Sequence, residues 1–389
     1  NTVSAKEDYF KVTLAIENGG ALTADLIGNI EIRAYNGAEL VFSKKLQGGL
    51  VNGLDLLGLL QSGDPVTLPF GPGVEFDRVA VGYNSLISLS VLSNSPIRLY
   101  SVERYGVGCP DPDPIVVTPT DPMLLQKDCA TQVLSFEHAN FPYNAVDGNN
   151  DTYVTLEASS GILLGGVLGE AYSGHVELGF GAPVEANKTV YVRIDFDENQ
   201  LGSLLDGSVG ELLGGVVDGV LLGNHYFTVE AKNGATTILE RSSNSGFNDA
   251  LGTGNGEVKI VQDKNGHYYV AVTSDAPFQS IRITEHLSAL VGAGTVEHMN
   301  VYHACFSTGA ELCEQAFATY SESDGISLDL LSVGSAGVNN AHLAIDDDDP
   351  SVEADETYSE IGIGTAGVGA STFQFVDFHT LSSPADYFK

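Results

Sequence analysis

The stretch YFTVEAKNGAT (residues 226–236) carries the pattern that decides the fold. Apolar and polar residues alternate along its first half, which is the period-two signature of a strand with one buried face. The pair Asn233-Gly234 follows, and Asn and Gly both accept the positive φ angles of a tight hairpin turn. The stretch therefore predicts one arm and the turn of an antiparallel hairpin.

The same pattern recurs along the whole chain. Alternating segments include VTLAIE, IEIRAY, VYVRIDF, GEVKIVQD, YYVAVTS and SIRITE, and turns such as Asn36-Gly37 and Asn265-Gly266 separate strands of this kind. Many short strands with regular turn residues are typical of sandwiches and jelly rolls. We predict an all-β protein made of antiparallel β-sandwich or jelly-roll repeats, with little helix.

Sequence landmarks also return in the same order, which indicates an internal repeat. The segments DYFKVTLAI, IEIRAYNGAEL, FDRVAVGY and LYSVERYGVGC match TVYVRIDFDEN, YFTVEAKNGAT, FQSIRITE and EHMNVYHAC further along. Stretches that open with CATQVLSF and CEQAFATY match each other, and ADYFK near the end of the chain repeats the first landmark. Chance similarity is the alternative explanation.

The repeat predicts a division of the chain into four parts. Residues 1–109 form the C-terminal part of one sandwich unit, residues 129–308 a complete unit, and residues 309–389 the N-terminal part of a further unit. Residues 110–128 are rich in proline and form a semi-rigid linker. We therefore expect the chain to be a piece of a longer polypeptide.

The four cysteines are Cys109, Cys129, Cys305 and Cys313. None forms a C-x-x-C pair, which argues against zinc, and their even number favours disulfides in an oxidising compartment. Because each neighbouring pair flanks a predicted boundary between units, we predict the bonds Cys109–Cys129 and Cys305–Cys313. Other pairings stay open on sequence grounds.

Charge and hydropathy bound the location and the partners. The chain has 51 acidic and 17 basic residues, a formal net charge of −34. Such a surface repels nucleic acid and anionic membranes. No long apolar run is free of charge, and Asn1 is not followed by a basic segment and an apolar core, so we expect neither a membrane span nor a signal peptide. We expect an extracellular or cell-surface protein.

Two acidic loops occupy equivalent positions in the predicted units. The loop NAVDGNNDT contains Asp147, Asn149 and Asp151, and the loop LAIDDDDPS contains Asp346 and Asp348. Calcium takes about six to eight oxygen ligands from such side chains and from backbone carbonyls. Each loop is thus a candidate calcium site. The alternative is a solvated turn stabilised by its own Asx side chains.

Sequence motifs of hydrolytic enzymes are missing. There is no G-x-S-x-G and no H-E-x-x-H, and the nine His residues are scattered singly. A carboxylate pair for glycoside hydrolysis would have to be assembled in space. An array also has little use for many copies of one active site. We predict that the chain is not an enzyme.

The order of landmarks resembles a known family. A cysteine strand, the NAVDGNNDTY turn, and the VELGFG, DYFKVTL, LDLLGLL, FDRVAV and VYHAC segments are similar to repeats of giant Bacteroidetes surface proteins, among them gliding-motility adhesins exported by type IX secretion. The turn also resembles the calcium-side loop of discoidin-like jelly rolls. In the last copy, Asp347 and Ser351 replace Gly148 and Thr152 of that motif.

The resemblance implies tandem extracellular sandwiches that form long filaments and bind surfaces or polysaccharide. We therefore expect a structural and adhesive segment of a bacterial surface fibre. Its partners would be neighbouring repeats and a surface polysaccharide or other cell-surface component. The alternative is an array of carbohydrate-binding modules, against which the lack of Trp argues, because sugars often stack on Trp. Calcium is the one cofactor that the loops suggest.

Overall fold

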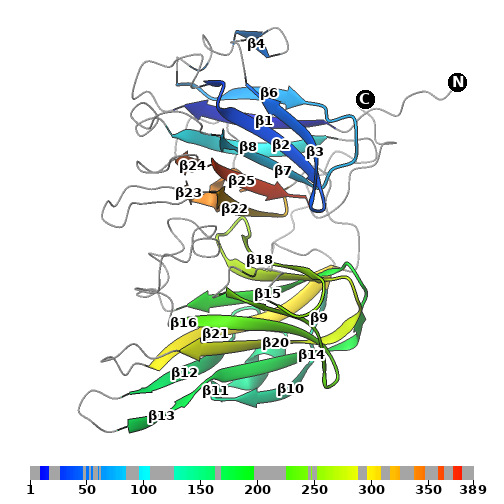
Figure 1. The fold of residues 1–389 in the computed structure, drawn as a ribbon, viewed down its shortest axis with the longest axis vertical. Helices are drawn as coiled ribbons and strands as arrows, with labels where there is room; N and C mark the ends of the chain where they lie inside the picture. The colour runs from blue at the N-terminus through cyan, green and yellow to red at the C-terminus, as the bar shows by residue number, and fades with distance from the viewer. Residues whose placement is uncertain are drawn as a thin grey trace, which may run out of the picture.

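The computed structural model contains two β-sandwiches that lie one above the other along the long axis (Figure 1). All strand pairs among the described residues are antiparallel, and the named elements there are strands apart from two short 3-10 turns, η2 (Pro142–Val146) and η5 (Ala341–Ala344). The predicted all-β class is therefore confirmed. The structure describes residues 9–16, 27–46, 50–51, 54–55, 60, 63–84, 96–105, 127–162, 168–196, 225–243, 247, 252–287, 296–307, 316–324, 337–346, 358–362 and 371–378.

The inserted sandwich, as we name it, comprises the described residues between 127 and 307. One sheet has the order β10-β14-β20-β16-β17 and the other β11-β12-β21-β15-β19-β18. The hairpin predicted from residues 226–236 is β16 and β17, with Gly234 at a φ of 58°. The strands are β9 (Lys127–Cys129), β10 (Gln132–Glu137), β11 (Ala139–Asn140), β12 (Val154–Ile162), β13 (Leu168–Tyr172), β14 (Gly174–Val184), β15 (Thr189–Phe196), β16 (His225–Asn233), β17 (Thr236–Ser242), β18 (Gly256–Gln262), β19 (Tyr268–Ser274), β20 (Phe278–Leu287) and β21 (Val296–Ser307).

The split sandwich, as we name it, draws strands from both ends of the chain. Its sheets have the orders β22-β25-β7-β2-β3 and β23-β24-β8-β1-β6. Two short strands, β4 and β5, pair only with each other among the described residues. The strands are β1 (Tyr9–Ile16), β2 (Ile30–Asn36), β3 (Glu39–Lys45), β4 (Leu50–Val51), β5 (Leu54–Asp55), β6 (Val66–Phe70), β7 (Arg78–Asn84), β8 (Ile97–Tyr105), β22 (Ala318–Asp324), β23 (Gly337–Asn339), β24 (Ser359–Gly362) and β25 (Ser371–Asp377).

The two outer segments thus join instead of standing as two incomplete units. β25 pairs with β7 from Ser371↔Asn84 to Asp377↔Arg78, and β24 pairs with β8. The physical reason is that the two halves are complementary and sit on one chain. Their high effective concentration favours pairing within the molecule over pairing with another molecule.

The two sandwiches share one strand order. The series β22, β25, β7, β2, β3 corresponds to β10, β14, β20, β16, β17, and the series β23, β24, β8, β1, β6 corresponds to β11, β12, β21, β15, β19. The turns η5 and η2 also correspond, and each follows a residue in the left-handed conformation, Asn340 and Phe141. A sequence repeat would produce this correspondence. That the repeat continues in tandem stays a prediction.

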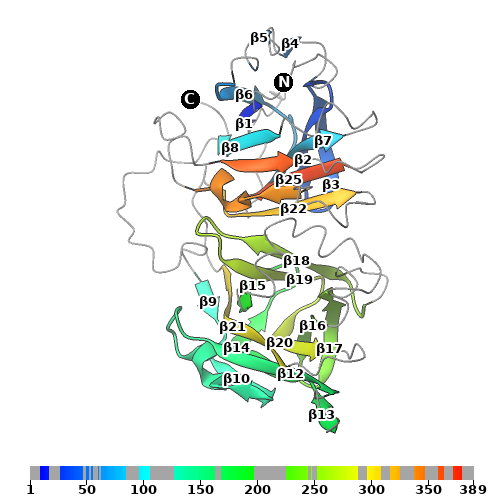
Figure 2. The same ribbon diagram turned by 90° about the vertical axis from the view of Figure 1, so that its left-hand side faces the viewer.

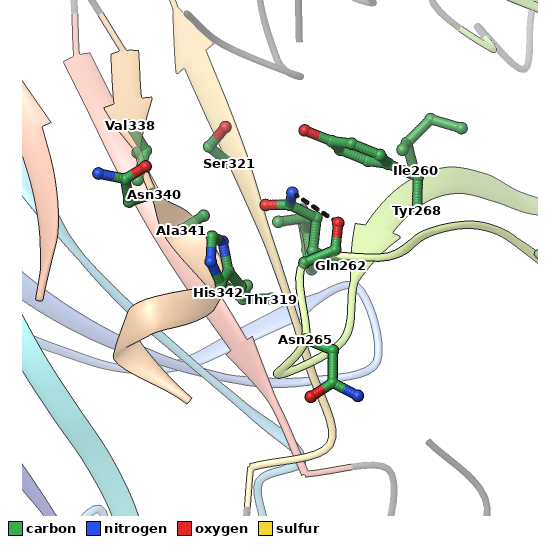
Figure 3. Close-up of a pocket in the computed structure, with 12 residues that line it drawn as sticks. Ile260, Gln262, Asn265, Tyr268, Thr319, Ser321, Val338, Asn340, Ala341 and His342 are labelled. Carbon is green, nitrogen blue, oxygen red and sulfur yellow. Dashed lines mark hydrogen bonds between the residues drawn. The ribbon is translucent and has the colours of Figure 1, made fainter. Parts of the chain in front are cut away.

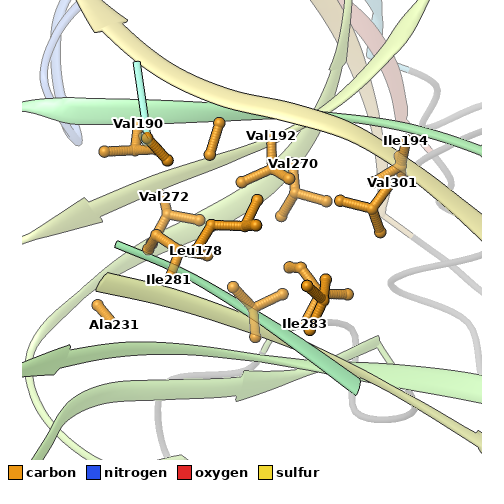
Figure 4. Packing of buried hydrophobic residues seen from close by; sticks show 14 of the residues in the cluster. Leu178, Val190, Val192, Ile194, Ala231, Val270, Val272, Ile281, Ile283 and Val301 are labelled. Atoms are coloured by element: carbon orange, nitrogen blue, oxygen red, sulfur yellow. The ribbon is translucent and has the colours of Figure 1, made fainter. Parts of the chain in front are cut away.

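Each sandwich has its own hydrophobic core, because alternate side chains of both sheets point inward. Val190, Val192 and Ile194 of β15 point into the core of the inserted sandwich (Figure 4), and Phe10 and Val12 of β1 lie in the core of the split one. Burying one such side chain contributes about 1.5–3 kcal/mol. The apolar residues that alternate along these sequence segments are therefore the residues that are buried in the core.

The disulfide pairing differs from the prediction. Cys129 of β9 is bonded to Cys305 of β21, with 4.0 Å between the Cα atoms. The predicted bonds Cys109–Cys129 and Cys305–Cys313 are therefore wrong, because each sulfur forms one disulfide. The prediction relied on proximity in sequence, whereas strand pairing brings the two ends of the inserted sandwich together. Cys109 and Cys313 lie outside the described residues.

Candidate functional site

The two sandwiches meet where β18 approaches β22 (Figures 1 and 2). One backbone pair, Gln262↔Thr319, links their sheets into a continuous sheet of 13 strands. An apolar cluster packs along this junction, so the contact is a packed interface. The cluster comprises Ala80, Tyr191, Val261, Tyr269, Ala271, Cys305, Ala318, Tyr320, Phe373 and Phe375.

Arg78 is the charged centre of the junction. Its buried guanidinium donates a 2.8 Å hydrogen bond to the Tyr320 hydroxyl and lies 3.8 Å from the Glu257 carboxylate of β18. Lys259 is 3.1 Å from Glu257 and lies over the Tyr320 ring. Burial alone would raise the pKa of Glu257, but Lys259 and Arg78 outweigh burial and lower it. The carboxylate therefore stays ionised and joins the two sandwiches.

In the inserted sandwich, the sheet that corresponds to β22-β25-β7-β2-β3 has a charged outer face where the split sandwich has an aromatic one. By strand register, Glu177 of β14 occupies the place of Phe375 of β25. The Glu177 carboxylate accepts hydrogen bonds from Arg282 at 2.7 Å, Ser280 at 2.8 Å and Lys232 at 3.1 Å. Burial alone would raise its pKa, but these donors lower it. This face is charged and internally paired, so it lacks the aromatic surface of the junction.

A cavity of about 280 Å³ opens at the junction, with walls from both sandwiches (Figure 3). Side chains from the β18–β19 hairpin face side chains from β22, β23 and η5 across it. Its described lining is uncharged, although the chain has a net charge of −34. The polar lining residues are Gln262, Asn265, Tyr268, Thr319, Tyr320, Ser321, Asn340 and His342.

Asp263 sets the shape of the turn that presents Asn265. Its buried carboxylate accepts hydrogen bonds from the Asn265 N–H at 2.9 Å and from the Tyr269 hydroxyl at 3.2 Å. Gly266 follows with a φ of 78°, which favours glycine. A Cβ at Gly266 would lie 3.4 Å from the His342 ring. The turn therefore fits closely against η5.

Gln374 holds the opposite wall in place. Its fully buried amide donates hydrogen bonds to the Ala341 carbonyl at 2.8 Å and the Thr319 hydroxyl at 3.0 Å, and it accepts one from Ser359. These bonds connect β25 with η5, β22 and β24. They fix η5, and with it the position of His342.

His342 has an unsatisfied buried nitrogen. Its Nδ1 atom is shielded from solvent and has no hydrogen-bond partner in the described part of the chain. Burial lowers the pKa of His342, and the nearby Asp263 offsets this only in part. The imidazole is therefore neutral at neutral pH.

The predicted calcium residues do not line this cavity. The Asp147 carboxylate accepts hydrogen bonds from the Asn149 N–H at 2.8 Å and the Thr152 hydroxyl at 2.9 Å, which is the pattern of an Asx turn. The described residues contain no group of three or more metal-ligating side chains. Calcium stays a prediction. The structure describes Asp147, Asn149, Asp151 and Asp346, whereas Asp348 lies outside the described residues.

Sequence reasoning missed the cavity because its walls come from two different sandwiches. Asn265 was visible only as part of an Asn-Gly turn, and His342 only as one scattered histidine. Neither residue belongs to a motif. The two meet because β18 lies beside β22, which depends on the closure of the split sandwich.

The chain was compared with protein families, curated proteins and solved structures. No protein-family model and no curated protein matches the chain. A structure of the Gt strain of infectious bursal disease virus aligns at 11% identity and a TM-score of 0.18, over 97% of this chain and 63% of that one. A VP2 subviral particle of the same virus aligns at 11% sequence identity and a TM-score of 0.18, and the alignment covers 97% of this chain and 68% of that one. No helix in the described residues is long and apolar enough to cross a membrane.

We predict that Asp263→Asn loosens the β18–β19 turn. The amide replaces a carboxylate that accepts several hydrogen bonds, so the free energy of unfolding should fall by about 1–3 kcal/mol. Urea denaturation measures this change. Asp275→Asn, at an exposed hydrogen bond to Asn255 near the other end of β19, is the control and should change it by less than about 0.5 kcal/mol. Equal effects of the two substitutions would contradict the role of the Asp263 carboxylate in holding the β18–β19 turn.

Acidification should destabilise the fold. Burial lowers the pKa values of His175, His286 and His342 below the ordinary 6.5. The unfolded chain then binds more protons than the folded one as the pH falls through that value, so the free energy of unfolding should decrease between pH 7 and pH 5, a range set around the ordinary His pKa of about 6.5. An NMR titration of His342 should give a midpoint below 6.5, and His342→Phe should flatten the decline. A midpoint at or above 6.5 would refute this.

Proposed function

We propose that the chain is a non-catalytic structural and adhesive segment of an extracellular bacterial surface protein. The observation that carries the proposal is the packed junction between two sandwiches of the same strand order. Interfaces between domains are usually polar and permit relative motion, whereas an apolar interface limits it. Two sandwiches held in this way form a stiff spacer.

Composition and covalent chemistry support an extracellular location. The Cys129–Cys305 bond fits an oxidising compartment, and the net charge of −34 keeps the surface soluble. The landmarks that resemble Bacteroidetes adhesin repeats lead us to propose a gliding-motility type of surface filament exported by type IX secretion.

An exposed aromatic surface is the proposed adhesive face. Phe136, Phe141 and Tyr143 are 48%, 72% and 63% exposed, and the rings of Phe136 and Tyr143 are 6.2 Å apart. We name these three residues the aromatic face. Phe136 is in β10, Phe141 immediately precedes η2 and Tyr143 is in η2, at the end of the inserted sandwich away from the junction (Figure 1). Exposed aromatic patches of this kind mark interaction sites, and their rings offer flat surfaces for sugar rings.

The backbone at Phe141 supports a binding role. Its φ of 55° and ψ of 49° are left-handed, which costs a residue with a Cβ about 1–2 kcal/mol. Asn340, at the corresponding place in the split sandwich, is a residue type that tolerates this conformation. An exposed Phe in a strained position makes no compensating packing contribution, and such strain often accompanies function.

The alternative function is a carbohydrate-binding module of a secreted protein. The aromatic face favours this reading as well, because it would serve the same kind of ligand. The two functions require different parts of the chain. A stiff filament needs the packed junction, whereas a binding module needs only the aromatic face.

We predict that Phe141→Asn raises stability while it lowers adhesion. Asn relieves the left-handed strain, so the free energy of unfolding should rise by about 0.5–1 kcal/mol. Removal of the exposed ring should weaken retention in native gels that contain soluble glucan, mannan, galactan or alginate. Val74→Asn, which removes a 48%-exposed side chain from the split sandwich, is the matched control and should leave retention unchanged.

Two outcomes would count against the proposal. If the unmodified chain is retained by none of these polysaccharides, and beads coated with it do not adhere to bacterial cells, the adhesive function fails. If retention is present but Phe141→Asn leaves it intact, the aromatic face is not the binding surface.

A further inference from the structure

We propose that the cavity at the junction is a binding site for one neutral sugar ring, a pyranose residue without ionised groups. The inference rests on the proposed adhesive function and adds to it a ligand class and a second site, distinct from the aromatic face. It is carried by the size of the cavity, the chemistry of its lining and its position between two sandwiches.

The size of the cavity limits the ligand. Pockets for drug-sized molecules have volumes of about 300–1,000 Å³. A cavity of about 280 Å³ lies just below this range and suits one small polar molecule. Gln262 from one sandwich lies across the cavity from Ser321 and His342 of the other, whereas the amide of Asn265 is directed away from them (Figure 3). A bound ring would therefore contact both sandwiches.

The lining selects a neutral polyol. Each of the amides of Gln262 and Asn340 offers both a donor and an acceptor, as a sugar hydroxyl does. A bound anion would meet no cationic side chain among the described lining residues, and a bound cation would meet no carboxylate. Because a buried unpaired charge is strongly unfavourable, sugar acids and amino sugars should be excluded.

Apolar atoms in the lining suit the C–H face of a pyranose. Tyr268 and Tyr320 contribute rings, and Ile260 and Val338 contribute aliphatic surface. Ligand sites typically combine apolar walls with a few convergent polar groups that fix orientation. The cavity has both kinds of wall.

The position of the site couples binding to the junction. A ligand that touches both walls binds only the joined arrangement, so it stabilises that arrangement by mass action. Binding should therefore raise the melting temperature of the chain, and charged sugars at the same concentration should not.

The test uses the full chain and defined probes. Saturation-transfer NMR and calorimetry would be run with the methyl glycosides of glucose, galactose and mannose, and with glucuronic acid and glucosamine as charged comparators. At least one neutral glycoside should bind in the millimolar range, and both charged sugars should bind at least tenfold more weakly. Failure of all the neutral glycosides to bind would overturn the inference, and so would equal binding of charged and neutral sugars.

A matched pair of variants locates the site. Gln262→Ala removes an amide that lines the cavity, and Gln279→Ala removes the same kind of amide from an exposed position on β20, outside the cavity lining. Gln262→Ala should weaken glycoside binding at least tenfold, and Gln279→Ala should leave it unchanged. Circular dichroism and melting curves check that both variants fold, and His342→Phe, which replaces the imidazole, gives a second variant of the wall.

The outcomes separate this inference from the proposed function. If the chain is retained by polysaccharide through the aromatic face but binds no glycoside, the cavity inference alone fails. If Gln262→Ala folds and binds glycoside as tightly as the unmodified chain, the sugar lies elsewhere. If neither polysaccharide nor glycoside binds, both fail.

Discussion

The antiparallel pairing of β7 with β25 is the contact on which the rest of the molecule depends. It joins residues 78–84 to residues 371–377, two segments that are separated in the sequence by the whole inserted sandwich. Because it closes the split sandwich, it places the aromatic side chains of β22 and β25 over β18 and β19. The junction with Arg78 and the cavity lined by His342 both follow from that placement.

Two sandwiches of one strand order carry different chemistry on corresponding faces. Phe375 packs into the junction, whereas Glu177 at the corresponding position is held by Lys232 and Arg282. The aromatic side chains of β22 and β25 at the junction are shielded from water by the inserted sandwich, whereas the charged and internally paired surface around Glu177 needs no such cover. The two sandwiches therefore share a strand order, but they do not share the surface that packs at the junction. The result is a pair of sandwiches with one packed junction and one exposed group of aromatic side chains, Phe136, Phe141 and Tyr143.

The sequence predicted what depends on local pattern. Period-two alternation located strands such as Thr189–Phe196, and Asn-Gly pairs located their turns. The sequence-based prediction failed where a contact depends on strand register. Cys129 meets Cys305 because β9 pairs with β21, and the spacing of the cysteines along the chain does not reveal this pairing. The cavity was invisible because His342 and Asn265 meet only after β18 lies beside β22.

Cross-linking of β8 to β24 tests most directly whether the two ends of the chain close one sandwich. Arg98 and Glu360 are paired positions on these strands, and the double variant Arg98→Cys, Glu360→Cys places a thiol on each. Peptide mapping without reductant should find the two introduced thiols bonded to each other within a monomer, at a yield independent of protein concentration. Linked dimers or multimers that increase with concentration, or the absence of this bond under oxidising conditions, would contradict a sandwich closed within one chain.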